Sequence, residues 1–105
     1  MDIREEGEAA VVALVGELDL PGANKAGREL ERLEKRGLEA LILDLRGLSF
    51  MDSSGLHMML TADARAKEEG RNFAVVRGPE AVDRVFRLTK AEQTIQMLED
   101  PAELQ

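Results

Sequence analysis

The chain has 105 residues, a length that predicts one domain of ordinary size. It contains no cysteine, which excludes disulfides, thiolate catalysis and cysteine-based zinc sites. Its formal charge of −7 has the same sign as nucleic acid, so non-specific phosphate binding is disfavoured. The sequence has no apolar run of membrane-spanning length and no basic-then-apolar start, and we therefore expect a cytoplasmic protein without a membrane partner.

The N-terminal third predicts two strands and a helix. Residues 11–15 form a short apolar run rich in β-branched side chains and closed by Gly16, which predicts a strand, and residues 2–5 predict a weak edge strand beside it. A helix opens at Pro21 and is expected to stop at Gly37, because proline is tolerated in a first turn and glycine favours a helix C-terminus. Its apolar stripe has a spacing of three and four residues: Ala23, Ala26, Leu30 and Leu33.

The middle of the chain predicts a second strand followed by a helix. Residues 41–45 are apolar almost throughout, as in a strand that is central in a sheet or covered on both faces. Residues 52–55 then predict a turn. The helix that follows is expected to run to about Glu69 and to end at Gly70.

The C-terminal third predicts a third strand at residues 72–76 and a helix that starts at Gly78-Pro79. Residues 94–98 fit either a final short strand or the start of a terminal helix, and the residues after Pro101 are expected to fray. The alternation of strands and helices predicts an α/β layered structure with parallel pairing. In the last helix the inward residues are expected to be Val82, Val85, Phe86 and Thr89.

The helix predicted from residue 52 to residue 69 has two distinct faces. One face is a stripe of mostly small residues that would let the helix lie close to a sheet: Gly55, Met59, Ala62 and Ala66. The outer face carries Ser54, Met58, Thr61 and Arg65. An adaptable methionine suits a docking surface, but single exposed apolar residues are also ordinary, so both interpretations of Met58 stay open.

The start of this helix combines one carboxylate, two hydroxyls and one glycine: Asp52, Ser53, Ser54 and Gly55. A helix N-terminus carries unpaired backbone N–H groups and a partial positive charge, so it favours aspartate and serine. A phosphate added there changes the local charge without disturbing a core. The position therefore suits a switch better than a catalytic centre.

Two other kinds of chemistry are weaker alternatives. Ser53 and His57 are four residues apart and could meet as a nucleophile and its base, but there is no G-x-S-x-G elbow, and an orienting carboxylate would also be required. Asp19, Asp44 and Asp52 lie near the ends of predicted elements and could bind Mg²⁺. Capping and turn roles for these aspartates are favoured, so we expect no metal, cofactor or catalytic residue.

Three segments together carry a family resemblance. Residues 16–19 before a helix, residues 41–45 and the block 48–56 resemble the STAS domains of bacterial anti-sigma factor antagonists. Gly78-Pro79 and the apolar pattern after it are similar to a later helix of the same family.

This resemblance covers about residues 3–98. It implies one STAS domain over residues 1–105, with a core at about 3–98 and a tail at about 99–105. It also implies an α/β fold in which a mixed sheet of about four to five strands has helices packed mainly on one side.

The resemblance further implies a binding protein rather than an enzyme. In the family, the unphosphorylated form binds an anti-sigma factor, often a GHKL-type serine kinase, and so releases a sigma factor. The kinase phosphorylates the first serine after the aspartate, which is Ser53 here, and a phosphatase reverses the modification. Together with the outer face of the helix, which contributes Met58, Thr61 and Arg65, the resemblance gives the expected partner contacts. They are Asp19, Asp52, Ser53, Ser54, Gly55, His57, Met58, Thr61 and Arg65.

The family reading also carries departures and alternatives. His57 stands where the family commonly has a small residue, and Lys90 stands where a glycine often ends the last helix. We expect a monomer or weak dimer that does not bind nucleic acid directly. A STAS scaffold or regulatory domain that does not act on a sigma factor stays an alternative, and a small serine hydrolase is a more distant one.

Overall fold

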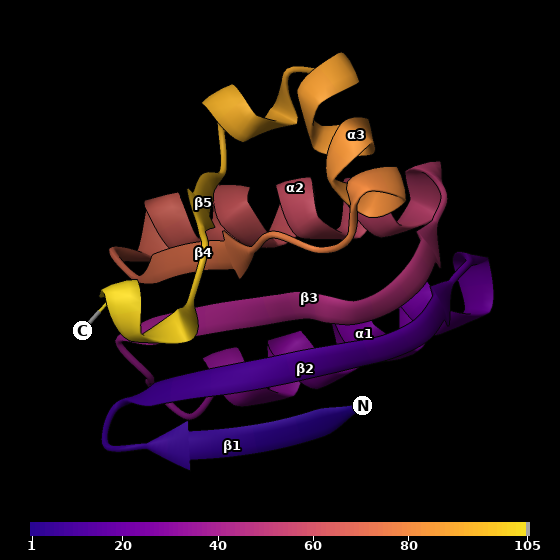
Figure 1. Cartoon of the computed structure of the whole chain (residues 1–105). Helices are drawn as coiled ribbons and strands as arrows, with labels where there is room; N and C mark the ends of the chain where they lie inside the picture. Colours follow the sequence, from indigo (N-terminus) through magenta and orange to yellow (C-terminus); the bar gives the residue numbers. More distant parts are fainter. Residues whose placement is uncertain (105) are drawn as a thin grey trace.

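The computed structural model describes residues 1–104. Five strands form one sheet in the order β1-β2-β3-β4-β5; β1 is antiparallel to β2, and the other neighbours are parallel (Figure 1). The strands are β1 (Asp2–Glu6), β2 (Ala9–Leu18), β3 (Ala40–Met51), β4 (Asn72–Val76) and β5 (Gln96–Leu98). The helices are α1 (Leu20–Glu34), α2 (Ser53–Glu69) and α3 (Glu80–Leu88), with 3-10 helices η1 (Ala91–Gln93) and η2 (Pro101–Leu104). The predicted α/β fold with a mixed sheet is confirmed.

The helices pack against one face of the sheet, as expected. Leu30 of α1, Met59 of α2 and Phe86 of α3 are all fully buried in one core with the inward side chains of β2, β3 and β4. The other sheet face carries a smaller buried cluster: Val11, Ile42, Ala74, Val76 and Leu98. This separation leaves the outer sides of α1 and α2 available to solvent.

The C-terminal segment differs from the expected frayed end. It forms η2, and Pro101 is buried. Residues of η2 line a shallow depression together with Arg4 and Arg46, two residues at the helix-free face of the sheet. In Figure 1 this yellow segment crosses in front of the sheet, whereas α1 and α2 lie behind it.

The predicted phase of α2 is confirmed. The stripe of Gly55, Met59, Ala62 and Ala66 is buried, and Leu56 is buried beside it. The amphipathic pattern did not indicate that Asp63 is buried. It is 4% exposed, and its Oδ2 forms an ion pair with Lys67 Nζ at 2.8 Å.

Two strands are longer than the apolar runs predicted. β2 continues through Gly16, which has a φ of 85°, and β3 continues to Met51. The two strands stay paired to Leu18↔Met51 through two shifts of register. Bulges of this kind add a residue and increase local twist, which obscures the alternation of polar and apolar residues that marks a strand in sequence.

The C-terminal elements correct one expectation and resolve another. Thr89 was expected to point inward but is exposed, and its hydroxyl donates to the Val85 carbonyl oxygen at 2.6 Å. Lys90 has a φ of 63°, a conformation that favours glycine and explains why a glycine suits this position. Of the two readings of residues 94–98, the short strand is confirmed, because Gln96–Leu98 pairs with β4.

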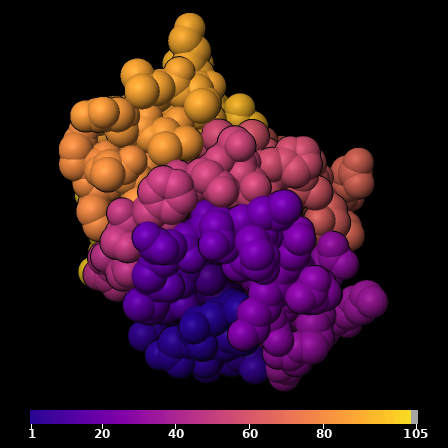
Figure 2. Space-filling model, turned by 90° about the vertical axis from the view of Figure 1, so that its right-hand side faces the viewer, coloured from indigo at the N-terminus to yellow at the C-terminus, as the bar shows by residue number. Residues whose placement is uncertain are grey.

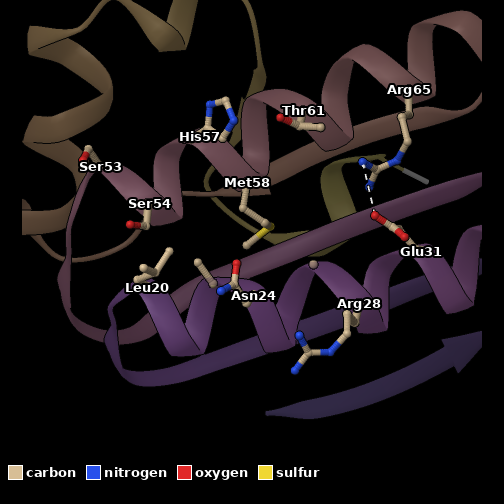
Figure 3. A pocket seen from close by; sticks show the side chains of 12 residues that line it. Leu20, Asn24, Arg28, Glu31, Ser53, Ser54, His57, Met58, Thr61 and Arg65 are labelled. Atoms are coloured by element: carbon tan, nitrogen blue, oxygen red, sulfur yellow. Dashed lines mark ion pairs between the residues drawn. The ribbon is translucent and has the colours of Figure 1, made fainter.

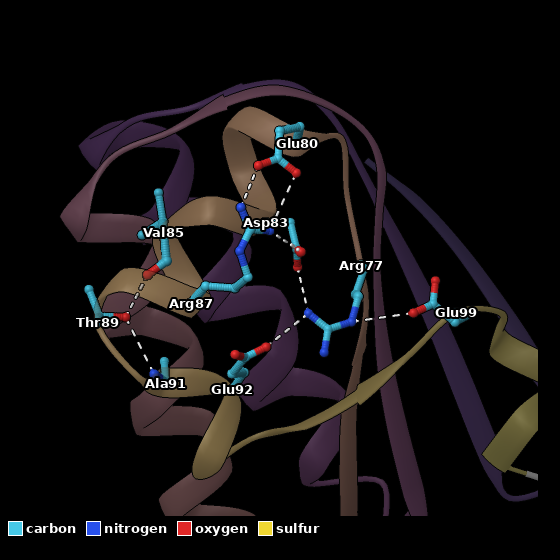
Figure 4. A network of polar contacts seen from close by, with 9 residues as sticks. All are labelled: Arg77, Glu80, Asp83, Val85, Arg87, Thr89, Ala91, Glu92 and Glu99. Atoms are coloured by element: carbon cyan, nitrogen blue, oxygen red, sulfur yellow. Dashed lines mark hydrogen bonds and ion pairs between the residues drawn. The ribbon is translucent and has the colours of Figure 1, made fainter.

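Arg77 joins the C-terminal elements to one another (Figure 4). Its guanidinium lies 2.8 Å from Asp83 of α3, 3.1 Å from Glu92 of η1 and 3.4 Å from Glu99. The hydrogen bond to Asp83 raises the pKa of Arg77, so this cation stays charged. Asp83 also pairs with Arg87 at 2.8 Å. The network is a structural connection between β4, α3 and the segment after β5.

A second ion pair joins α1 to α2. The Nε and Nη2 atoms of Arg65 donate to the two carboxylate oxygens of Glu34 at 2.8 and 2.9 Å. The Glu34 side chain is only 7% exposed and that of Arg65 is 26% exposed. The hydrogen bond to Glu34 raises the pKa of Arg65. Because planar two-point pairs fix both side chains, this contact sets the spacing of the two helices at their C-terminal halves.

The phase of α2 gives a first prediction. Met59→Asp should destabilise the fold by about 3–5 kcal/mol, because it places a charge in a site without solvent. Thr61→Asp, two residues later on the exposed side, should change the free energy of unfolding by less than about 0.5 kcal/mol. Urea melts of the two variants compare these values. Equal stability would mean that the assigned faces of α2 are wrong.

The link between α1 and α2 gives a second prediction. Arg65→Ala should destabilise the protein by about 2–3 kcal/mol, because the buried carboxylate of Glu34 loses both of its close hydrogen bonds and keeps only Arg71, whose Nη1 lies 3.9 Å away. Arg28→Ala removes an exposed arginine of α1 and should stay within about 0.5 kcal/mol of the parent. Chemical denaturation measures both, and a silent Arg65→Ala would show that the pair does not hold the helices.

Candidate functional site

The start of α2 places Ser53 on the surface. Asp52 is the N-cap residue, and its Oδ1 accepts hydrogen bonds from the backbone N–H groups of Ser54 at 2.9 Å and Gly55 at 3.4 Å. Ser53 is therefore the first residue of the helix, and it is exposed. An exposed hydroxyl on a fixed helix turn is accessible to a modifying enzyme without local unfolding.

Gly55 determines how closely α2 approaches the sheet. A Cβ atom built on Gly55 would lie 2.7 Å from Met51 Cγ and 2.8 Å from Leu18 Cδ2, so only glycine fits without rearrangement. Gly55 is buried. Its contribution to the site is therefore to let the helix start rest on the ends of β2 and β3, with no side chain to offer a partner.

The starts of α1 and α2 lie at the same edge of the sheet. Asp19 caps α1 by accepting from the Gly22 N–H at 3.1 Å, and the Asp52 N–H donates to the Leu18 carbonyl oxygen at 3.3 Å. The favoured capping role of Asp19 and Asp52 is thus confirmed. Asp44 lies elsewhere and is held by Arg46 at 2.7 Å, which lowers the pKa of its carboxyl. Among residues 1–104 no group of three or more His, Asp or Glu side chains is placed to hold a metal ion.

A groove of about 560 Å³ runs between α1 and α2. Six of the nine expected partner contacts line it from the α2 side: Ser53, Ser54, His57, Met58, Thr61 and Arg65. The α1 side is made by Leu20, Ala23, Asn24, Gly27, Arg28 and Glu31. Figure 3 shows Ser53 and Leu20 at one end of the groove and the contact of Arg65 with Glu31 at the other. The predicted residues are therefore brought together, with Asp19 and Asp52 at the adjoining helix starts.

The groove has an apolar centre and mixed charges at its far end. The side chain of Met58 is half-buried and packs beside Gly27, whose Cβ position would be 3.4 Å from Met58 Cγ. Met58 was expected on the outer surface; it lies instead between the helices, because α1 lies alongside that face. Arg65, an expected partner contact, is held by Glu34 and lies 3.9 Å from Glu31.

The α1 side of the groove was missed from sequence. None of Leu20, Asn24, Arg28 and Glu31 was singled out from the sequence. The sequence feature that could have indicated this side is Leu20, a large apolar residue directly after the N-cap and outside the buried stripe of α1. It is 57% exposed, which makes it one of the most exposed apolar side chains described.

Comparisons with known proteins agree with the fold. A model of the STAS domain matches residues 1–104. An anti-sigma F factor antagonist from Paenibacillus polymyxa is 35% identical over 66 residues, which cover 62% of this chain and 56% of that relative. The chain thus matches little more than half the length of this curated relative.

Solved structures show the same architecture. An anti-sigma factor antagonist from Mycobacterium paratuberculosis superposes with a TM-score of 0.85 at 25% identity, covering 96% of this chain and 86% of that one. The fold is also that of SpoIIAA in its unphosphorylated form, with a TM-score of 0.84 at 18% identity over 98% of this chain and 91% of that one. No helix within residues 1–104 has both the length and the apolar character needed to cross a membrane. The sheet order, the one-sided helices and the full-length match establish that this chain belongs to the STAS domain family.

Proposed function

We propose that the protein is an anti-sigma factor antagonist whose unphosphorylated form binds an anti-sigma factor through the groove between α1 and α2. The observation that carries the proposal is the position of Ser53, which is exposed at the head of α2 and lines that groove. The identity of 35% to an anti-sigma F factor antagonist supports the same assignment. Binding releases a sigma factor, and phosphorylation of Ser53 ends the binding.

The partner in this proposal is a GHKL-type serine kinase, and a phosphoserine phosphatase restores the active form. Both reactions take place in a bacterial cytoplasm. The protein itself acts by binding and performs no catalysis. The formal charge of −7 fits a partner with a basic surface, because opposite charges steer two proteins toward each other.

Phosphorylation blocks such a complex through charge and volume. A phosphoryl group on Ser53 adds about −1.5 to −2 charges next to the N-cap carboxylate of Asp52. The backbone N–H groups of Ser54 and Gly55 already donate to Asp52, so the phosphoryl oxygens could bind them only by displacing that carboxylate. A partner seated over this point would bury the new charge and clash with it, and each loss of about 1.4 kcal/mol weakens binding tenfold.

The phosphoacceptor is the first point to test. Incubation with the cognate kinase and ATP should place phosphate on Ser53, because it is exposed, whereas Ser54 is half-buried in the groove. Mass spectrometry of the parent and of Ser53→Ala locates the group, with Ser54→Ala as the matched control. Phosphate that persists in Ser53→Ala would contradict the assignment.

The groove itself is tested by an apolar residue at its rim. Leu20→Ala should weaken binding of the cognate anti-sigma factor about fivefold or more, since truncation of a well-buried interface side chain often costs about 1 kcal/mol. Val15 is similarly exposed, at 68%, and lies outside this groove, so Val15→Ala should bind like the parent. Titration calorimetry measures both affinities. A larger loss for Val15→Ala would place the interface on the β2–β3 ribbon instead.

A further inference from the structure

We propose that His57 is the internal counterion of the phosphorylated form: its imidazolium donates a hydrogen bond to an oxygen of the phosphoryl group on Ser53. The inference rests on the proposed function for the existence of that modification. It goes beyond it by assigning a role in the phosphorylated form to His57, which the sequence indicated only as a partner contact and as a weak candidate base for Ser53.

The spacing of the two side chains permits this contact. Ser53 is the first residue of α2 and His57 follows four residues later, so the two occupy neighbouring positions on one helix face. Both are exposed, and both line the groove between α1 and α2. In Figure 3 the Ser53 hydroxyl and the His57 ring project to the same side of α2. Cβ atoms at this spacing are about 5–6 Å apart, a gap that a phosphoryl group and an imidazole ring together span.

The backbone N–H groups that usually bind an anion at a helix start already have an acceptor here. The Asp52 carboxylate accepts from the N–H groups of Ser54 and Gly55, so a phosphoryl group would have to displace it to reach them. Asp19 places a second carboxylate at the neighbouring helix start. The phosphoryl group therefore needs a cation from a side chain, and His57 is one helical turn away.

The other charged groups around the groove are engaged or differently placed. Arg65 is bound to Glu34 and lies near Glu31, three turns along α2 from Ser53. In Figure 3 the Arg28 guanidinium lies on the side of α1 that faces away from α2, where Ser53 is.

On α3, which lies next to α2 in Figures 1 and 2, Arg87 pairs with Glu80 and Asp83. Arg84 of α3 is exposed, and it is the competing cation that a test must include.

The pair would respond to pH near neutrality. Phosphoserine loses its second proton with a pKa of about 6, and histidine titrates at about 6.5. Each charge stabilises the other, so pairing raises the pKa of His57 and lowers that of the phosphoserine.

The test uses the whole chain with phosphoserine encoded at position 53. Because the chain has one histidine, NMR reports the His57 imidazole without ambiguity, and ³¹P NMR reports the phosphoserine. The pKa of His57 should rise by about half a unit on phosphorylation, and the second pKa of the phosphoserine should fall by a similar amount. His57→Gln should abolish the fall, whereas Arg84→Ala should preserve it.

A matched control places phosphoserine at position 49. This position is exposed on β3, so the modification adds the same charge outside α2. An equal rise in the His57 pKa with phosphoserine 49 would overturn the pair, as would a phosphoserine 53 pKa unaffected by His57→Gln. No kinase or partner enters this measurement. Its failure is therefore distinct from failure of the proposed function, which would appear as undiminished partner binding by the phosphoserine 53 protein.

Discussion

The parallel pairing of β2 with β3 determines where the site lies. These strands remain paired to Leu18↔Met51, several residues beyond the last pair that β3 makes with β4, Asp44↔Val76. Both strands lead directly into helices, so the two N-caps and the first turns of α1 and α2 meet at one edge of the sheet. Gly55 rests against Leu18 and Met51 at this junction, which couples the helix starts to the strand ends.

In the pair of helices α1 and α2, the contacts that stabilise the fold are separate from the groove proposed to bind a partner. Toward the sheet, α2 buries its small-residue stripe; toward α1, the Arg65–Glu34 pair fixes the spacing at the far end. The groove between these contacts is open near Ser53, where the side chains are short or adaptable. A rigid frame around a small variable surface allows a modification to change recognition while the core stays as it is.

Much of the fold could be predicted because local patterns and global packing agree. The spacing of Gly55, Met59, Ala62 and Ala66 correctly indicated the buried face of α2, while Pro21 and Asp52 indicated the starts of α1 and α2. The errors arose where a residue's surroundings come from distant parts of the chain. Met58 and Arg65 are outside the buried stripe, but α1 covers one and binds the other. Likewise, β2 extends beyond its apolar run because it stays paired with β3 through two shifts of register, at each of which β3 contributes one extra residue.

The short helix η2 has a practical consequence for the shape of any larger assembly. It lies against the helix-free face of the sheet, whereas the groove opens between helices on the opposite layer (Figure 1). A tether attached after η2 therefore leaves the molecule on the side away from the groove. A fluorophore, an affinity tag or a fused domain attached there would label or immobilise the protein while the groove stayed accessible to a partner.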